Sequence, residues 1–136
     1  MRLAAMANFE KDQGIAVVRI TVAILLGIHG IARIALGIVD DFGGFLSQVG
    51  LPLGVVWAWG VTIFELAGAV FLILRKHVVL VATLFIIELL AGIILVHWQE
   101  GWFVVGAGRN GVEYSVLLIV CLSALIVSAK RSPVAS

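Results

Sequence analysis

Ionisable side chains stand inside long apolar stretches of this sequence, among them His29, Arg33, Glu65 and Glu88. If these stretches are helices that cross a bilayer, each charge at the centre costs about 2.5–3.5 kcal/mol on insertion scales, so each needs a partner or a function. With a rise of about 1.5 Å per residue, His29, Glu65 and Glu88 lie roughly 13–17 Å deep and Arg33 about 8 Å deep. We expect these residues from three helices to meet in one half of the membrane.

Two interpretations of this cluster are open. Arg33 and Glu65 form either a structural ion pair that fixes the register of two helices or part of a ligand or proton site. Glu88 is either a protonated carboxyl group that donates one hydrogen bond or a functional group. His29 is either a hydrogen-bonded residue of the bundle or a ligand. Arg19, nearer the other surface, is expected to extend toward the lipid headgroups.

Residues 106–111 spell G-x-G-x-x-G, the pattern of a dinucleotide-binding loop. That function needs a preceding strand and a βαβ unit, and neither is expected between two apolar helices. A local structure explains the segment better: Asn110 as the N-cap of the next helix, with Glu113 completing a capping box. Arg109 and the amides of this helix terminus could still bind an anion.

Metal and redox motifs are absent from the sequence. A di-iron bundle needs E-x-x-H pairs on facing helices, and His97 and Glu100 occur in the reverse order. Cys121 is the single cysteine, so no intrachain disulfide is possible. We therefore predict no metal site and find no self-contained catalytic constellation.

Composition shows which elements must position these residues. Of the 136 residues 62% are apolar and 12% are charged, against about 45–50% and about 25% in soluble domains. This excludes a soluble enzyme, and the net charge of +1 gives no field for nucleic acid. Four stretches, 14–38, 54–74, 78–98 and 111–129, are long enough to cross a bilayer, and their apolar residues do not alternate as in a β-barrel. We predict one domain over residues 1–136, an all-α membrane protein with four transmembrane helices.

Basic residues predict the orientation of the helices. Arg109 is the basic residue of the loops 39–53 and 99–110, where Asp40, Asp41 and Glu100 also lie. The other side carries Arg2, Lys11, Arg75, Lys76, Lys130 and Arg131. By the positive-inside rule we expect both termini to be cytoplasmic. Residues 1–12 and 131–136 are expected to be short polar tails.

Small residues predict the inner face of each helix, because they let membrane helices approach closely. We expect a four-helix bundle whose interior is polar and charged in its outer half. The predicted inner stripes are Arg19, Ala23, Leu26, Gly30, Arg33 and Gly37; Ala58, Thr62, Glu65 and Ala69; Leu84, Glu88, Ala91, Gly92 and Leu95; and Glu113, Leu117, Cys121, Ala124 and Ser128.

The sequence resembles the DoxX family of small four-helix membrane proteins. The matching pieces are Arg19, the pair His29-Gly30 with Arg33, GLP at 50–52, ELAG at 65–68, GWF at 101–103 and GRNGVEY at 108–114. They occur in order over residues 14–129. Many members carry a lysine where Arg33 stands, a change that keeps the charge.

The resemblance implies a link to quinone chemistry, because the family takes its name from a subunit of a terminal quinol oxidase and has relatives linked to thiosulfate:quinone oxidoreduction. One hypothesis is therefore an accessory or quinone-interacting component of a membrane redox system, with quinone as cofactor and a redox subunit as partner. The alternative is a non-enzymatic bundle that binds or transports a small solute or protons. For either hypothesis the resemblance implies a multi-pass protein of the bacterial inner membrane, and a homo-oligomer is a further expected form of assembly. The candidate ligand or proton sites are His29, Arg33, Glu65, Glu88, Arg109, Asn110 and Glu113.

Overall fold

The computed structural model describes residues 2–131, with side chains described from Gln13 onward, and all its regular elements are helical. The α-helices are α1 (Arg2–Ala35), α2 (Val39–Gln48), α3 (Gly54–Ile73), α4 (Val78–Gly92) and α5 (Glu113–Arg131). A π turn (η1, Ile93–His97) and a 3-10 turn (η2, Trp98–Glu100) continue α4.

Within residues 2–131, four helices are long and apolar enough to cross a membrane. They are Gln13–Ala35, Gly54–Ile73, Val78–Glu100 and Glu113–Arg131. The predicted transmembrane helices are therefore present, with ends that differ by a few residues. The N-terminal residues, predicted as a polar tail, instead continue α1 back to Arg2. Residues 132–136 of the predicted C-terminal tail lie outside the described part of the chain.

Helix α1 ends at Ala35, before its predicted end, because Gly37 stops it. Gly37 has φ +67°, and its N–H donates to the carbonyl of Ile34 while the N–H of Ile38 donates to the carbonyl of Arg33. This is a Schellman motif, in which a glycine takes the left-handed position after the helix. The chain turns back there toward α2.

Helix α2 was not predicted, because residues 39–53 were expected to be a loop. The segment is too short to cross a bilayer, and the sequence predicted only a connection between two transmembrane helices there. The helix forms because Val39, Gly43 and Leu46 share one face and are buried against the start of α3. A Cβ built on Gly54 would lie 2.0 Å from the Gly43 carbonyl oxygen, so the two backbones touch.

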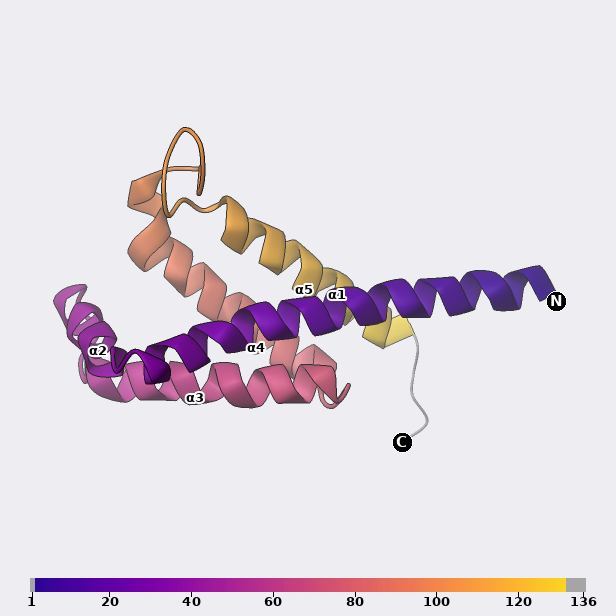
Figure 1. Cartoon of the computed structure of the whole chain (residues 1–136), viewed down its shortest axis with the longest axis horizontal. Helices are drawn as coiled ribbons and strands as arrows, with labels where there is room; N and C mark the ends of the chain where they lie inside the picture. The colour runs from indigo at the N-terminus through magenta and orange to yellow at the C-terminus, as the bar shows by residue number, and fades with distance from the viewer. Residues whose placement is uncertain (1, 132–136) are drawn as a thin grey trace.

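Helices α1 and α3 pack side by side along small residues, and α4 and α5 form a second neighbouring pair (Figure 1). A Cβ on Gly27 would lie 3.0 Å from Ala69, and one on Gly30 would lie 3.0 Å from the Thr62 carbonyl oxygen. As predicted, the inner faces of these two helices include Ala23, Leu26 and Gly30 on α1, and Ala58, Thr62, Glu65 and Ala69 on α3.

The inner faces predicted for α4 and α5 are wrong in part: Glu88 and Cys121 do face the interior, but other predicted members do not. Leu84 and Leu117 are 42% and 58% exposed, and Ala124 is also exposed. The buried residues are instead Val81, Ala82 and Phe85 on α4, and Ser115, Leu118, Leu122 and Leu125 on α5. Both helices are apolar on every side, so small residues did not mark a unique face.

Glycines also explain the loop before α5. Gly106 has φ +78°, and a Cβ on Gly111 would lie 2.4 Å from the carbonyl oxygen of Trp102. The N–H groups of Gly111, Val112 and Glu113 donate to the carbonyls of Phe103, Gly101 and Trp102. The G-x-G-x-x-G pattern therefore serves a tight loop between two helices.

Figure 1 places the loop between α4 and α5 at the end of the molecule that lies away from the start of α1 and the end of α5. Helix α2 lies toward the same end, beside the start of α3. The other end holds the turn between α3 and α4 and the end of α5. Residues Ile15, Arg75 and Ala129 line one cavity there, which brings three distant segments of the chain together.

Candidate functional site

Arg33 of α1 and Glu65 of α3 form a two-pronged ion pair. The Nη1 and Nη2 atoms of Arg33 donate to Oε2 and Oε1 of Glu65, each at 2.7 Å. The side chain of Glu65 is 4% exposed and that of Arg33 is 16% exposed. The predicted pairing is present, and its parallel hydrogen bonds are the geometry that favours arginine over lysine at such a site.

Two neighbours complete the surroundings of Arg33. Its Nη1 atom also donates to the Thr62 hydroxyl at 3.1 Å, and that hydroxyl donates to the Ala58 carbonyl at 2.7 Å. The Phe42 ring of α2 lies 4.9 Å from the guanidinium carbon, a cation–π contact. Neither Thr62 nor Phe42 was a predicted site residue, although Thr62 stands one helical turn before Glu65.

Gly30 lets the ion pair form between closely packed helices. A Cβ at this position would lie 3.2 Å from Oε2 of Glu65 and 3.0 Å from the Thr62 backbone oxygen. The missing side chain leaves room for the carboxylate against the α1 backbone. The sequence pair His29-Gly30 thus contributes its glycine to the site.

Helix α4 brings a second carboxyl group, that of Glu88, to the ion pair. Its carboxyl lies beside that of Glu65 and within electrostatic range of Arg33. The Oε2 atom of Glu88 is buried, and as a carboxylate oxygen it has no donor among the described residues; in its protonated form Glu88 can share that proton with the neighbouring Glu65. Leaving a buried polar atom unpaired costs about 1–3 kcal/mol. Arg33, Glu65 and Glu88 together form the Arg33 cluster. Glu88 is the residue of this cluster that has an oxygen atom free to form a further hydrogen bond.

His29 does not join this cluster, contrary to the prediction. Its side chain is exposed on α1, whereas Gly27 and Gly30 face α3. Successive helical residues are about 100° apart, so the residue before Gly30 points away from the contact. The His29 side chain therefore lies on the outer surface of the helix bundle.

The predicted capping box before α5 is also absent. Asn110 has φ +60°, and α5 begins at Glu113. Oε1 of Glu113 accepts from the backbone N–H of Val104 at 2.8 Å and therefore ties the loop to the helix. The π turn after Glu88 carries His97, whose Nδ1 donates to the Asn110 carbonyl at 2.7 Å.

Arg109 is exposed in this loop. Within residues 13–131, no hydrogen bond or ion pair joins Arg109, Asn110 or Glu113 to the Arg33 cluster. Because the amides of Gly111, Val112 and Glu113 already donate to backbone carbonyls, they are not free for an anion. In the same described part of the chain, no group of three His, Cys, Asp or Glu side chains could hold a metal ion.

Arg19 does not extend freely toward the lipid headgroups. Its Nη1 atom donates to the backbone carbonyls of Leu72 and Ile73, the latter at 2.8 Å, at the end of α3. A cation suits this position because the carbonyl end of a helix is negative. The sequence offered no signal for the contact beyond the position of Arg19 on the inner stripe of α1.

The chain matches a protein-family model. The family model DoxX matches residues 14–98, which is more than half of the chain. The matched range includes Arg33, Glu65 and Glu88, and it ends before the GWF and GRNGVEY segments. No curated protein and no solved structure matches the chain.

Proposed function

Because the chain belongs to the DoxX family and its described part holds four helices able to cross a membrane, we propose that Arg33, Glu65 and Glu88 form a ligand site within the bilayer. The unpartnered Oε2 of Glu88 supports the proposal. Arg33 and Glu65 already satisfy each other, so a ligand is most simply bound by the remaining carboxyl group.

Quinone is the ligand class we propose, with the protein as an accessory component of a membrane redox system. A quinone is an apolar molecule with carbonyl acceptors, and it reaches this depth through the lipid. The carboxylic acid form of Glu88 can donate a hydrogen bond to such a carbonyl, and part of Arg33 remains exposed. A bound quinone would supply two-electron redox chemistry, and a partner subunit would exchange those electrons.

Binding or transport of protons or a small solute is the second candidate. It is favoured by the neighbouring carboxyl groups of Glu65 and Glu88 on separate helices, because either can carry a proton. Ionisable residues within a membrane commonly mark such pathways.

We further propose that both termini face the cytoplasm of a bacterial inner membrane. This is supported by the position of the turn containing Arg75 and Lys76, which lies at the same end of the bundle as the last turn of α5 with Lys130 and Arg131. Positively charged segments next to transmembrane helices remain on the cytoplasmic side. Assembly with a redox subunit or a second copy of the chain is part of the same proposal.

Native mass spectrometry of the detergent-extracted protein tests the ligand. We expect a retained quinone, or binding of an added short-chain quinone, that Glu88→Leu weakens about tenfold, because leucine has no donor for the quinone carbonyl. Glu100→Leu, in the exposed turn after α4, is the matched control and should bind normally. Equal quinone binding by both variants would contradict the proposal. Glu88-dependent acidification of proteoliposomes without quinone binding would favour the second candidate.

A further inference from the structure

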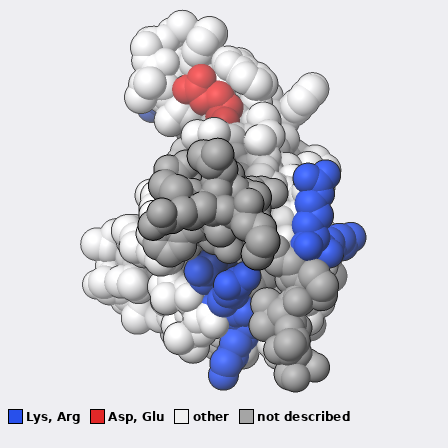
Figure 2. Space-filling view, turned by 90° about the vertical axis from the view of Figure 1, so that its right-hand side faces the viewer, with Lys and Arg blue, Asp and Glu red and all other residues white. Residues whose placement is uncertain are grey.

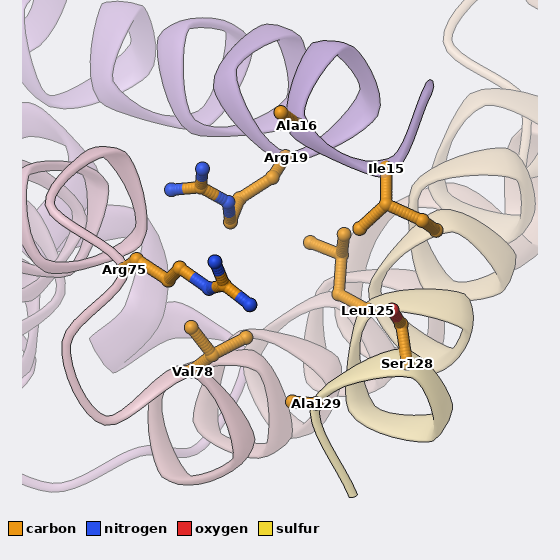
Figure 3. Close-up of a pocket in the computed structure, with 8 residues that line it drawn as sticks. All are labelled: Ile15, Ala16, Arg19, Arg75, Val78, Leu125, Ser128 and Ala129. Carbon is orange, nitrogen blue, oxygen red and sulfur yellow. The ribbon is translucent and has the colours of Figure 1, made fainter. Parts of the chain in front are cut away.

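A small cavity lies at the end of the bundle away from the Arg33 cluster. Its volume is about 60 Å³, and it lies between α1, the turn from α3 to α4, and α5. Arg19 and Arg75 reach into it from different segments of the chain (Figure 3). The remaining wall contains Ser128 and apolar side chains such as Ile15, Val78 and Leu125.

The two guanidinium groups at this cavity lie close enough to repel each other. Within residues 13–131, neither forms an ion pair with a carboxylate, and the ion pair found there is that of Arg33 with Glu65. Arg19 is held by its Nη1 bonds to the end of α3, and no described hydrogen bond uses its Nε or Nη2. The cavity thus presents oriented donors and excess positive charge.

The backbone of Arg75 gives an independent sign that its side chain has a role. Arg75 has φ +58° and occupies the same position after α3 that Gly37 occupies after α1. Its N–H donates to the Leu72 carbonyl and the N–H of Lys76 donates to the Phe71 carbonyl, which completes a second Schellman motif. Glycine is favoured at this left-handed position because a residue with a Cβ is strained there. Arginine at position 75 therefore costs backbone free energy that glycine would not.

We propose that Arg19 and Arg75 bind a phosphate group in this cavity, and that the phosphate belongs to the headgroup of an anionic phospholipid. Arginine pairs recognise phosphate oxygens through parallel charge-assisted hydrogen bonds. This proposal does not depend on the function of the Arg33 cluster.

The position of the cavity favours a lipid over a free phosphate. The membrane-crossing segments begin or end beside it, at Gln13, Ile73, Val78 and Arg131, so it lies at the level of the headgroups. Figure 2 looks onto this end, where Lys and Arg side chains gather, whereas acidic side chains appear apart near the top of the view.

Retention of lipid by the detergent-purified full chain tests the site. Native mass spectrometry after exchange into mixed micelles should show one retained phosphatidylglycerol in preference to phosphatidylcholine. Arg75→Gly should reduce that retention about tenfold, because it removes one charged partner of the phosphate. The variant should fold at least as well as the parent chain, since glycine relieves the strain of the left-handed backbone. A stable fold separates loss of the site from loss of the structure.

Lys76→Gln is the matched control, because Lys76 is the exposed basic neighbour that does not line the cavity. It should retain phosphatidylglycerol within about twofold of the parent chain. Equal losses for Arg75→Gly and Lys76→Gln would overturn the proposal in favour of diffuse surface charge, as would equal retention of both lipids by the parent chain. Inorganic phosphate that displaces the lipid and itself requires Arg75 would overturn the assignment to a lipid.

Discussion

At the scale of single residues, Arg33 and Glu65 stabilise each other. Both charged side chains are largely buried, and each is neutralised by the opposite charge of its partner. Glu65→Ala and Arg33→Ala should each lower stability by roughly 3–5 kcal/mol, less where water or a proton reaches the residue left behind. The double variant should recover part of this loss. Thermal unfolding of the four proteins in detergent measures the coupling, and strictly additive losses would contradict a direct interaction.

Glu65→Gln distinguishes a structural pair from a functional one. The amide keeps the shape of the side chain but carries no negative charge and takes up no proton at neutral pH. A variant that folds with near-normal stability but loses quinone binding or proton transfer would make Glu65 part of the functional site. A variant that loses stability alone would make the ion pair structural. The unfolding midpoint and ligand binding must therefore be measured on the same preparation.

The sequence predicted this ion pair but misplaced His29, and the difference has a physical cause. Opposite charges within apolar helices are stabilised by pairing. The estimated depth and the charge of Arg33 and Glu65 were therefore sufficient to predict that they form an ion pair. A histidine can be neutral, which leaves its direction to the packing of its neighbours. The contacts of Gly27 and Gly30 with α3 determine that direction, and the sequence pattern did not show which small residues would touch.

At the scale of elements, the contact between α2 and α3 requires a glycine at position 54. A Cβ there would lie 2.0 Å from the Gly43 carbonyl oxygen and 2.4 Å from the Ser47 hydroxyl. Gly54→Ala should therefore separate the helices and cost about 1–3 kcal/mol, the usual range for overpacking. Thermal unfolding measures the loss.

Gly44→Ala is the matched control for this contact. Gly44 stands next to Gly43 in α2, and a Cβ there meets nothing within 4 Å. Since alanine favours a helix over glycine by up to about 1 kcal/mol, this change should be neutral or stabilising. Equal destabilisation by both variants would show that α2 does not pack on α3 as described.

The sequence predicted the four membrane-crossing helices, but not the short helix α2 or the buried face of α5. The membrane-crossing helices follow from length and hydropathy alone. The short α2 depends on tertiary contacts of Val39 and Leu46, and no local signal distinguished it from a loop. The burial of Ser115 and Leu118 on α5 depends on how the helix is rotated against its neighbours, which an evenly apolar sequence does not specify.

At the scale of the whole molecule, the proposed orientation follows from the end of the bundle on which basic residues lie. The α3–α4 turn with Arg75 and Lys76 lies at one end, and α2 with Asp40 and Asp41 lies toward the other (Figure 1). Transferring the basic end across the membrane is unfavourable, so that end should remain in the cytoplasm.

A membrane-impermeant maleimide tests this orientation in intact cells. Single cysteines replace the exposed residues Asp41 and Lys76 in a Cys121→Ala background, which removes the one native thiol. Asp41→Cys should react from outside, and Lys76→Cys only after the membrane is permeabilised. The reverse pattern would invert the orientation and place the Arg33 cluster in the cytoplasmic half of the bilayer. Labelling of both positions from outside would be incompatible with α3 crossing the membrane, because that helix alone separates the α2 segment from the turn that carries Lys76.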